Sequence, residues 1–170
     1  WFILFSCRNI DNLSFPPDPP FEKDLCGKCR RCIDHCPTQC ILPNRTIDAN
    51  RCISYLTIEN RGHIPEGLHT KINGWIFGCD VCQQVCPWNL KYSDEPNLNY
   101  FKLESNNEKI NLSKELYITR SEFKIKYINS PISRTRYFGY KRNLLVVSGN
   151  HFEPSLIEPL KFIKTHEEDP

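Results

Sequence analysis

Cys26-Gly-Lys-Cys29-Arg-Arg-Cys32-Ile-Asp-His-Cys36-Pro37 is the stretch of sequence around which the rest of the chain is organised. Two residues separate Cys26 from Cys29 and Cys29 from Cys32, three residues separate Cys32 from Cys36, and a proline follows. This spacing is typical of the thiolate ligands of [4Fe–4S] clusters, and in two-cluster proteins the fourth cysteine ligates the other cluster. The run therefore predicts a partner motif elsewhere in the chain.

The partner motif is Cys79-Asp-Val-Cys82-Gln-Gln-Val-Cys86-Pro87, which repeats the spacing of the last three cysteines of the first run. Ile76 stands where the first cysteine of this second run is expected. Only Cys40 and Cys52 lie between the two runs. Cys40 is so near the first run that we interpret it as a small core residue. Cys52 is therefore the better candidate for the missing ligand.

Exchange of the fourth cysteines between the runs gives two complete ligand sets. Cluster 1 is predicted to be bound by Cys26, Cys29, Cys32 and Cys86. Cluster 2 is predicted to be bound by Cys36, Cys52, Cys79 and Cys82. Two four-cysteine zinc sites are the alternative, but zinc motifs pair two CxxC knuckles and need neither a third close cysteine nor the Cys-Pro endings. We therefore expect two [4Fe–4S] clusters.

Composition limits the classes of protein to which the chain could belong. It has 170 residues, ten cysteines and a net charge of only +2, so any affinity for nucleic acid must come from a local patch. The CxxCxxC clustering argues against a disulfide framework, and no secretory signal or membrane span is recognisable in the sequence. These features favour a reducing, cytoplasmic setting without membrane contact, and we expect a monomer.

Three segments follow from the distribution of prolines, cysteines and charges. Residues 1–25 read as the end of a preceding domain and a Pro-rich linker, and they contain Cys7, interpreted as an ordinary buried thiol. Residues 26–92 form the two-[4Fe–4S] ferredoxin-like domain, within which residues 51–59 could be strand or helix. Residues 93–170 form a connector and a helical, HEAT-like segment. The expected fold is mainly α with small β content.

The last segment contains three candidate helices. Residues 121–128 have helical spacing of apolar residues, with Ser121 as a possible N-cap. Residues 140–147 are predicted to form the next helix, ended by Gly149. Residues 154–163 are predicted to form the third, with a proline inside it that is tolerated only near a helix start.

A basic segment within residues 120–142 contains seven Lys or Arg residues and only one acidic residue, Glu122. Tyr137, Phe138 and Tyr140 are interleaved with the last four of the cations. Cations can contact phosphates, and exposed aromatic rings can stack on unpaired bases, although many charged runs are simply solvated helix faces. The candidate RNA-binding residues are Arg134, Arg136, Lys141 and Arg142.

The residues around the cysteines resemble the epoxyqueuosine reductase family. The resemblance is carried by Pro16–Pro37, Arg51–Glu59, Ile76–Asn89, Ser130–Arg134 and Arg142–Asn150, and Cys52 falls where the pattern of that family has it. In this family, a cobalamin-binding N-terminal domain precedes the cluster domain, and helical HEAT-like elements often follow. The resemblance implies reduction of epoxyqueuosine at the wobble position of certain tRNAs to queuosine.

The same resemblance implies an electron path, an RNA partner and a set of residues near cobalamin. Electrons from an external donor would pass through the two clusters to cobalamin, and the RNA partner would be a tRNA anticodon region. The neighbourhood of cobalamin in this chain would include Ser54, Cys79 and Asp80. The catalytic acid of the family belongs to its N-terminal domain, so no catalytic residue is named here, and these 170 residues alone are expected to be inactive.

Two other readings remain open from the sequence. One is a stand-alone two-cluster ferredoxin that carries electrons for another oxidoreductase. The other is the cluster domain of a different cobalamin-dependent enzyme, such as a reductive dehalogenase. The basic and aromatic segment after residue 120 discriminates among them, because neither alternative requires it.

Overall fold

The computed structural model describes residues 16, 18–20, 22–93 and 110–166. Within these residues all regular structure is helical, and the β content is limited to one isolated antiparallel bridge between Ile41 and Ile47. The prediction of a mainly α fold is confirmed. In chain order the elements are α1 (Arg31–His35), η1 (Ala49–Arg51), α2 (Ile53–Ile58), α3 (Glu66–Ile72), α4 (Val81–Gln84), α5 (Pro87–Tyr92), α6 (Leu112–Glu115), α7 (Arg120–Lys126), η3 (Pro131–Thr135), α8 (Arg136–Asn150), η4 (Pro154–Leu156) and α9 (Ile157–His166).

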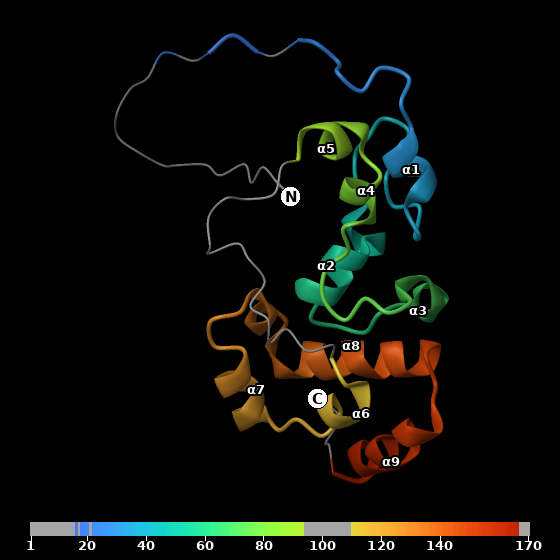
Figure 1. Ribbon diagram of the computed structural model, residues 1–170, viewed down its shortest axis with the longest axis vertical. Coiled ribbons are helices and arrows are strands. Elements are labelled where there is room, and N and C mark those ends of the chain that lie inside the picture. Colours follow the sequence, from blue (N-terminus) through green and yellow to red (C-terminus); the bar gives the residue numbers. More distant parts are fainter. Residues whose placement is uncertain (1–15, 17, 21, 94–109, 167–170) are drawn as a thin grey trace.

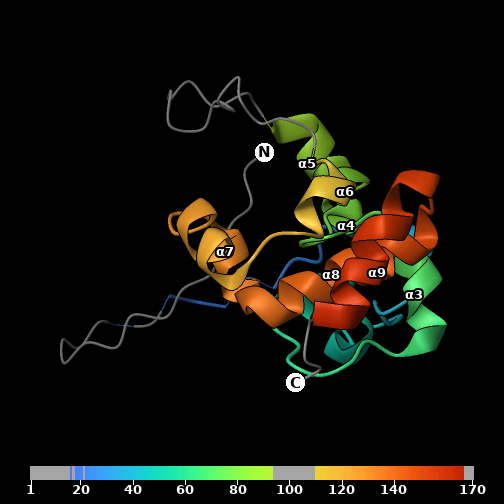
Figure 2. The same ribbon diagram turned by 90° about the horizontal axis from the view of Figure 1, so that it is seen from below.

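The molecule is elongated and has two halves, which we call the cysteine-rich half (residues 22–93) and the helical half (residues 110–166). In Figure 1, the short helices α1, α4 and α5 lie at one end and α7 and α9 at the other. The long helix α8 crosses between the halves, with α2 and α3 packed against it. Figure 2 shows α6, α7 and α9 gathered around α8 in the view from below. The helix α8 therefore packs against helices of both the cysteine-rich half and its own helical half.

Two apolar clusters hold these helices together, and α8 contributes to both. The first is built from the helical half and includes the buried residues Leu116, Ile118, Phe123, Tyr127, Tyr140, Leu144, Leu156 and Ile163. The second joins the halves and includes Ile53, Leu56, Ile64, Leu68, Ile72 and Val147. Burial of apolar surface is the main favourable term in folding, so these clusters set the relative position of α2, α3 and α8.

The helix predicted over residues 121–128 is α7, but its cap differs from the prediction. Thr119, not Ser121, is the N-cap, and it forms a capping box with Glu122. The Thr119 hydroxyl accepts a hydrogen bond from the Glu122 main-chain N–H, and the Glu122 carboxylate accepts one from the Thr119 main-chain N–H. This reciprocal pattern satisfies two free donors at the helix start, which a cap at Ser121 would not do here.

The prediction that Gly149 ends the next helix is wrong. The helix α8 starts at Arg136 and continues through Gly149 to Asn150, with His151 as its C-cap. A glycine inside a helix costs about 1 kcal/mol relative to alanine. Because Leu144 and Val147 bury the same helix against the two apolar clusters, tertiary packing outweighs this local cost.

The remaining ambiguous segments are helical. Residues 51–59, which the sequence left as strand or helix, contain η1 and α2. The third predicted helix is divided into η4 and α9, and Pro159 lies in the first turn of α9, where a missing N–H donor costs little. Cys7 and most of the predicted linker and connector lie outside the described residues. Among the helices that are described, none has the length and hydropathy required to cross a bilayer.

Candidate metal centre

Tight local turns deliver the four thiols of predicted cluster 1. Gly27 has a φ of +49°, a conformation that favours glycine, and the Cys29 main-chain N–H bonds the Cys26 carbonyl at 2.9 Å. The helix α1 starts soon after Cys29 and carries Cys32 in its first turn. Cys86 arrives from the other run as the N-cap residue of α5. The turn and the two short helices therefore present thiols from residues that are far apart in sequence.

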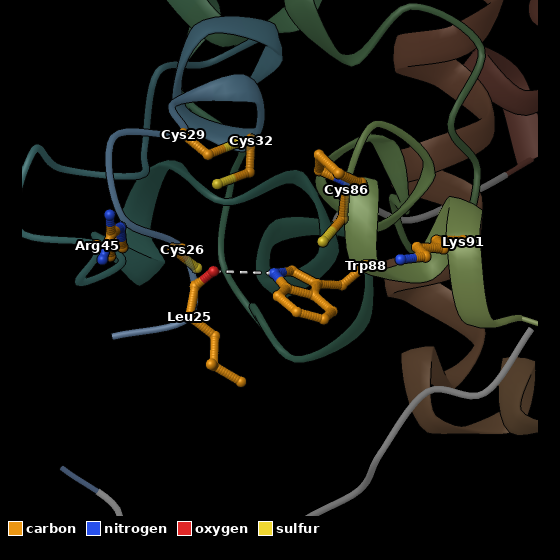
Figure 3. A pocket seen from close by; sticks show the side chains of 9 residues that line it. Leu25, Cys26, Cys29, Cys32, Arg45, Cys86, Trp88 and Lys91 are labelled. Carbon is orange, nitrogen blue, oxygen red and sulfur yellow. Dashed lines mark hydrogen bonds between the residues drawn. The ribbon is translucent and has the colours of Figure 1, made fainter. Parts of the chain in front are cut away.

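These four cysteines line one cavity of about 350 Å³. Figure 3 shows Cys26, Cys29, Cys32 and Cys86 around the same space, between the α1 region and α5. Its other lining residues are Leu25, Arg45, Pro87, Trp88 and Lys91. The Trp88 indole N–H donates to the Leu25 carbonyl at 3.1 Å and so closes one side of the cavity.

The two basic residues at this cavity complement the negative charge that thiolates would bring. The Arg45 guanidinium donates to the Asp24 carboxylate at 2.9 Å and also to the Gly27 carbonyl at 2.6 Å. These bonds tie the loop that follows α1 to the segment that leads into Cys26. The hydrogen bond from Arg45 holds the pKa of Asp24 below its usual value. Lys91 provides the second cation from α5.

Three of the residues of predicted cluster 2 lie in or next to the short helices α1, α2 and α4. Cys52 is the N-cap of α2, Cys36 is the C-cap of α1, and Cys82 is part of α4, which packs against α1. Burial raises the pKa of both Cys79 and Cys82, and the charges of Cys52 and Cys36 add to the effect. The four thiols are therefore electrostatic neighbours. Without a metal, this crowding disfavours ionisation of Cys79 and Cys82, and a bound cation would relieve it.

Cys40 has the buried position expected of a core thiol, with 3% of its surface exposed. Its Sγ also lies 3.4 Å from the Sγ of Cys36, a contact that spacing alone did not predict. Burial raises the pKa of Cys40 to about 12. Burial has the same tendency at Cys36, but hydrogen bonds from Thr38 and Cys40 outweigh it and lower the Cys36 pKa. Cys36 is thus the member of the pair that is better prepared to be a thiolate ligand.

This arrangement fits [4Fe–4S] groups better than single ions. All the cysteines in the described part of the chain are free thiols. Among the same residues, no group of three or more His, Cys, Asp or Glu could hold a metal ion. A lone zinc ion draws four thiolates to about 2.3 Å from one point, whereas a four-iron cubane stands between more widely spaced thiolates. A cavity lined by four cysteines meets the second requirement.

The residues predicted to lie near cobalamin are neighbours of the second ligand set. Ser54 is half-buried in the first turn of α2, two residues after Cys52. Asp80 is exposed at the N-cap position of α4, directly after Cys79. The Asp80 side chain makes no capping hydrogen bond, so helix capping does not explain the carboxylate at this position. The role of these residues stays a prediction.

The four candidate RNA-binding residues are divided between the surface and the interior. Arg134 is exposed and pairs with Glu59, and Arg136 is also exposed. Lys141 is buried, with 4% of its surface exposed, and its amine donates to the Leu116 carbonyl. Arg142 is half-buried and donates to main-chain carbonyls of α2 and the loop that follows it. The structure therefore brings only the first two residues to the solvent, and Lys141 and Arg142 have internal partners.

Sequence reasoning missed several residues that shape the site. Lys91 lies five residues after Cys86, so its position soon after the second cysteine run was an available signal. Trp88, in contrast, was expected from the sequence to shield the site as an apolar residue, and it lines the cavity. Arg45 offered no such signal, because it meets Asp24 from 21 residues away. Thr57 and Asn143 were missed for the same reason, since their hydrogen bonds span 21 and 86 residues.

Comparison with known proteins supports this picture of the cysteine-rich half. Residues 25–89 match the family described as the 4Fe-4S double cluster binding domain. The chain is 40% identical over 135 residues to the epoxyqueuosine reductase of Atelocyanobacterium thalassa, covering 79% of this chain and 44% of the relative. It is 39% identical over 165 residues to that of Francisella cf. novicida, covering 96% of this chain and 45% of the relative.

Two solved structures extend the similarity to both halves. One is epoxyqueuosine reductase from Bacillus subtilis, with a TM-score of 0.80 and 32% identity over 92% of this chain and 41% of the other. The second is epoxyqueuosine reductase with an epoxyqueuosine-modified tRNA-Tyr stem loop, with a TM-score of 0.78 and 33% identity over 92% of this chain and 40% of the other. The chain spans less than half the length of these relatives. Over the length that it shares with them, this chain is similar to the epoxyqueuosine reductases in both sequence and fold.

Proposed function

We propose that this chain is the iron–sulfur and RNA-contacting part of an enzyme that reduces epoxyqueuosine, at the wobble position of tRNA, to queuosine. The observation that carries the proposal is the cavity where Cys86 meets the three cysteines of the first run. A single four-iron cluster there would be bound by both runs, as the exchange of fourth cysteines requires. The proposal also rests on the similarity to epoxyqueuosine reductases.

In this proposal the eight cysteines hold two [4Fe–4S] clusters, one in each ligand set. When bound, the clusters supply single-electron transfer and cobalamin supplies a strongly reducing centre. The chain contributes the surroundings: Trp88 and Leu25 form an apolar side of the cavity at the first set, and Arg45 and Lys91 offset negative charge. Ser54 and Asp80, beside the second set, would face cobalamin. An external donor would supply the electrons, in a cytoplasmic monomer.

The RNA-contacting surface is proposed to centre on Arg134 and Arg136. Both are exposed: Arg134 lies in η3, and Arg136 is the first residue of α8. Nearby, the Arg120 guanidinium stacks over the Phe138 ring at 4.9 Å, so an aromatic surface and several cations lie together. Such a surface can contact phosphates and unpaired bases of an anticodon region.

Iron and sulfide analysis of the anaerobically reconstituted chain tests the cluster proposal. We expect about eight iron and eight sulfide per chain, from two four-iron clusters. Cys86→Ala and Cys52→Ala should each damage a different cluster, while Cys40→Ala should leave the iron content unchanged. A wild-type value near four iron, or equal damage from Cys40→Ala, would contradict the two ligand sets.

Binding of a tRNA anticodon stem-loop tests the RNA proposal. Arg134→Ala combined with Arg136→Ala should weaken binding and flatten its dependence on salt, because each lost phosphate contact reduces the slope by roughly 0.7–0.9. Lys161→Ala is the matched control, because Lys161 is an exposed cation on α9 that pairs with Glu158. Iron-loaded protein with no affinity for the stem-loop would favour the alternative of an electron carrier.

A further inference from the structure

Two buried polar side chains outside the ligand sets connect the helical half to the second set of cysteines. Asn143, fully buried on α8, donates from its amide nitrogen to the carbonyls of Thr57 at 2.7 Å and Ile76 at 2.9 Å. Thr57, also buried, donates from its hydroxyl to the Ile53 carbonyl at 2.7 Å. The same hydroxyl accepts a hydrogen bond from the Gly78 main-chain N–H at 3.0 Å. We call these contacts the Asn143–Thr57–Gly78 bridge.

The bridge ends beside two predicted ligands of cluster 2. Gly78 directly precedes Cys79, and Thr57 belongs to α2, whose N-cap is Cys52. Gly78 has a φ of +71°, so the chain turns sharply just before Cys79. A β-carbon at Gly78 would meet no other atom within 4 Å, so the turn has room around Gly78 itself, while its neighbours Ile76 and Cys79 pack against the second apolar cluster. The hydrogen bond to the Thr57 hydroxyl fixes the direction of the Gly78 N–H.

Arg142 keeps the amide of Asn143 in the orientation that the bridge needs. The Asn143 side-chain oxygen accepts hydrogen bonds from the Arg142 guanidinium at 2.9 and 3.2 Å. This leaves the amide nitrogen to donate to the two carbonyls. The guanidinium also donates to the Leu56 carbonyl at 2.6 Å and the Asn60 carbonyl at 2.9 Å, at the end of α2. Each buried polar group of the bridge therefore has a partner, as buried polar groups require.

We propose that Thr57 and Asn143 are positioning residues for cluster 2, which fix the Cys79 main chain relative to α2 and thereby the spacing of the Cys52 and Cys79 thiols. The inference rests on the ligand sets proposed above. Residues that hydrogen-bond around metal ligands set ligand orientation, and their loss typically lowers metal affinity by about 10–100-fold. Reduction potentials of iron–sulfur clusters depend on the same surroundings.

A second asparagine of α8 provides a matched control. Asn150 lies seven residues after Asn143 and so on the same side of the helix. Its amide donates to the His69 carbonyl at 2.7 Å and the Asn73 carbonyl at 3.0 Å, at the end of α3. No predicted ligand belongs to α3. Asn150→Ala therefore removes a similar pair of hydrogen bonds between the halves without touching the second ligand set.

The test uses the anaerobically reconstituted chain and compares Thr57→Val, Thr57→Ser, Asn143→Ala and Asn150→Ala with the wild type. Asn143→Ala is expected to act on cluster 2 as Thr57→Val does. Valine keeps the shape of threonine but lacks the hydroxyl, whereas serine restores it. The electron paramagnetic resonance signal and reduction potential of each cluster are measured, and the signal that Cys52→Ala removes identifies cluster 2. We expect Thr57→Val to shift or remove this signal and to speed the loss of iron from cluster 2 at least about tenfold. Cluster 1 should be unchanged.

Thr57→Ser and Asn150→Ala should retain both wild-type signals. If Thr57→Val keeps both signals and potentials at wild-type values, the positioning role is refuted. If the wild type itself binds fewer than two clusters, the proposed function fails instead. A measurement on the wild type keeps the test valid even if a variant does not fold. Because the Gly78 N–H donates to the Thr57 hydroxyl, this amide should exchange slowly with deuterium. Fast exchange of the Gly78 amide in a folded chain would show that the bridge does not form.

Discussion

Two regions of this molecule, the helical half and residues 22–50 of the cysteine-rich half, are organised by different physical means. The helical half buries eight apolar or aromatic residues in one cluster, among them Phe123, Tyr127 and Tyr140 in mutual ring contact. In contrast, residues 22–50 bury only Thr38, Cys40 and Ile41. Four cysteines of that segment are exposed or partly exposed around the predicted cluster sites.

The difference in buried apolar surface indicates which source of folding free energy each region depends on. Burial of apolar surface supports the helical half without any cofactor. The segment that carries the first cysteine run has too little buried surface for this, and metal binding commonly supplies the missing folding free energy in such regions. The second apolar cluster joins the halves through α2, α3 and α8, so the loss of order in one half should stop at that junction.

Removal of iron should give the largest effect and should act on one half only. In protein prepared without iron, we expect amides of residues 26–45 and of α4 to exchange rapidly with deuterium, because their order depends on bound clusters. Amides of α8 should stay protected. Exchange measured by mass spectrometry on apo and reconstituted protein checks this, and equal protection of residues 26–45 in both would contradict the contrast between the halves.

Leu144→Ala should destabilise the helical half by about 2–5 kcal/mol, because it opens a cavity in the apolar cluster. Leu144 is fully buried, while its neighbour Leu145 is 38% exposed and provides the control. Leu145→Ala should change the unfolding free energy by less than about 1 kcal/mol. Denaturant unfolding followed by tyrosine circular dichroism measures both. Similar losses from the two variants would show that the cluster does not dominate this half.

Glu115 should give the smallest of these effects, visible as a dependence on pH. Burial tends to raise its pKa, but hydrogen bonds from Lys126 at 2.6 Å, Tyr127 at 2.7 Å and Tyr140 at 2.9 Å outweigh this and lower the pKa below 4.5. Because the folded pKa is lower than the unfolded one, the contribution to stability is complete above the unfolded pKa. It is lost as the pH falls through the folded pKa.

Glu115→Gln should therefore destabilise the helical half by about 1–2 kcal/mol at neutral pH, through the loss of charge-assisted hydrogen bonds. The difference between variant and wild type should shrink as the pH falls below about 4. Glu158→Gln is the control, because Glu158 is an exposed partner of Lys161. Unfolding curves from pH 7 to pH 3 measure the difference, and a difference that grows toward low pH would contradict this sign.

Features of the fold that depend on neighbours in sequence could be predicted from the sequence, whereas features that depend on long-range contacts could not. Cysteine spacing and the helices near residues 121–128 and 154–163 follow from neighbours in sequence, and the structure places helices there. The length of α8 could not be predicted, because Gly149 is unfavourable locally and is overruled by packing against α2 and α3. The cap of α7 is also a local feature: Thr119 and Ser121 are both residue types that favour an N-cap, and only Thr119 has a glutamate three residues later with which to form a capping box.

The sequence by itself predicted the chemistry of the chain: residue types at short spacing point to a cluster-binding domain, and residues 25–89 match a 4Fe-4S double cluster binding domain. The resemblance to epoxyqueuosine reductases rests on the residues around the cysteine runs, and the choice of Cys52 stays a prediction. Only the tertiary structure decided where the side chains of α8 go. Lys141 and Arg142 belong to a basic run that reads as an RNA surface, yet their donors meet carbonyls of α2 and the segment after α6. The physical reason is that a buried main-chain carbonyl requires a hydrogen-bond donor. Which side chain supplies that donor depends on which helices pack together, and this is set by the tertiary structure.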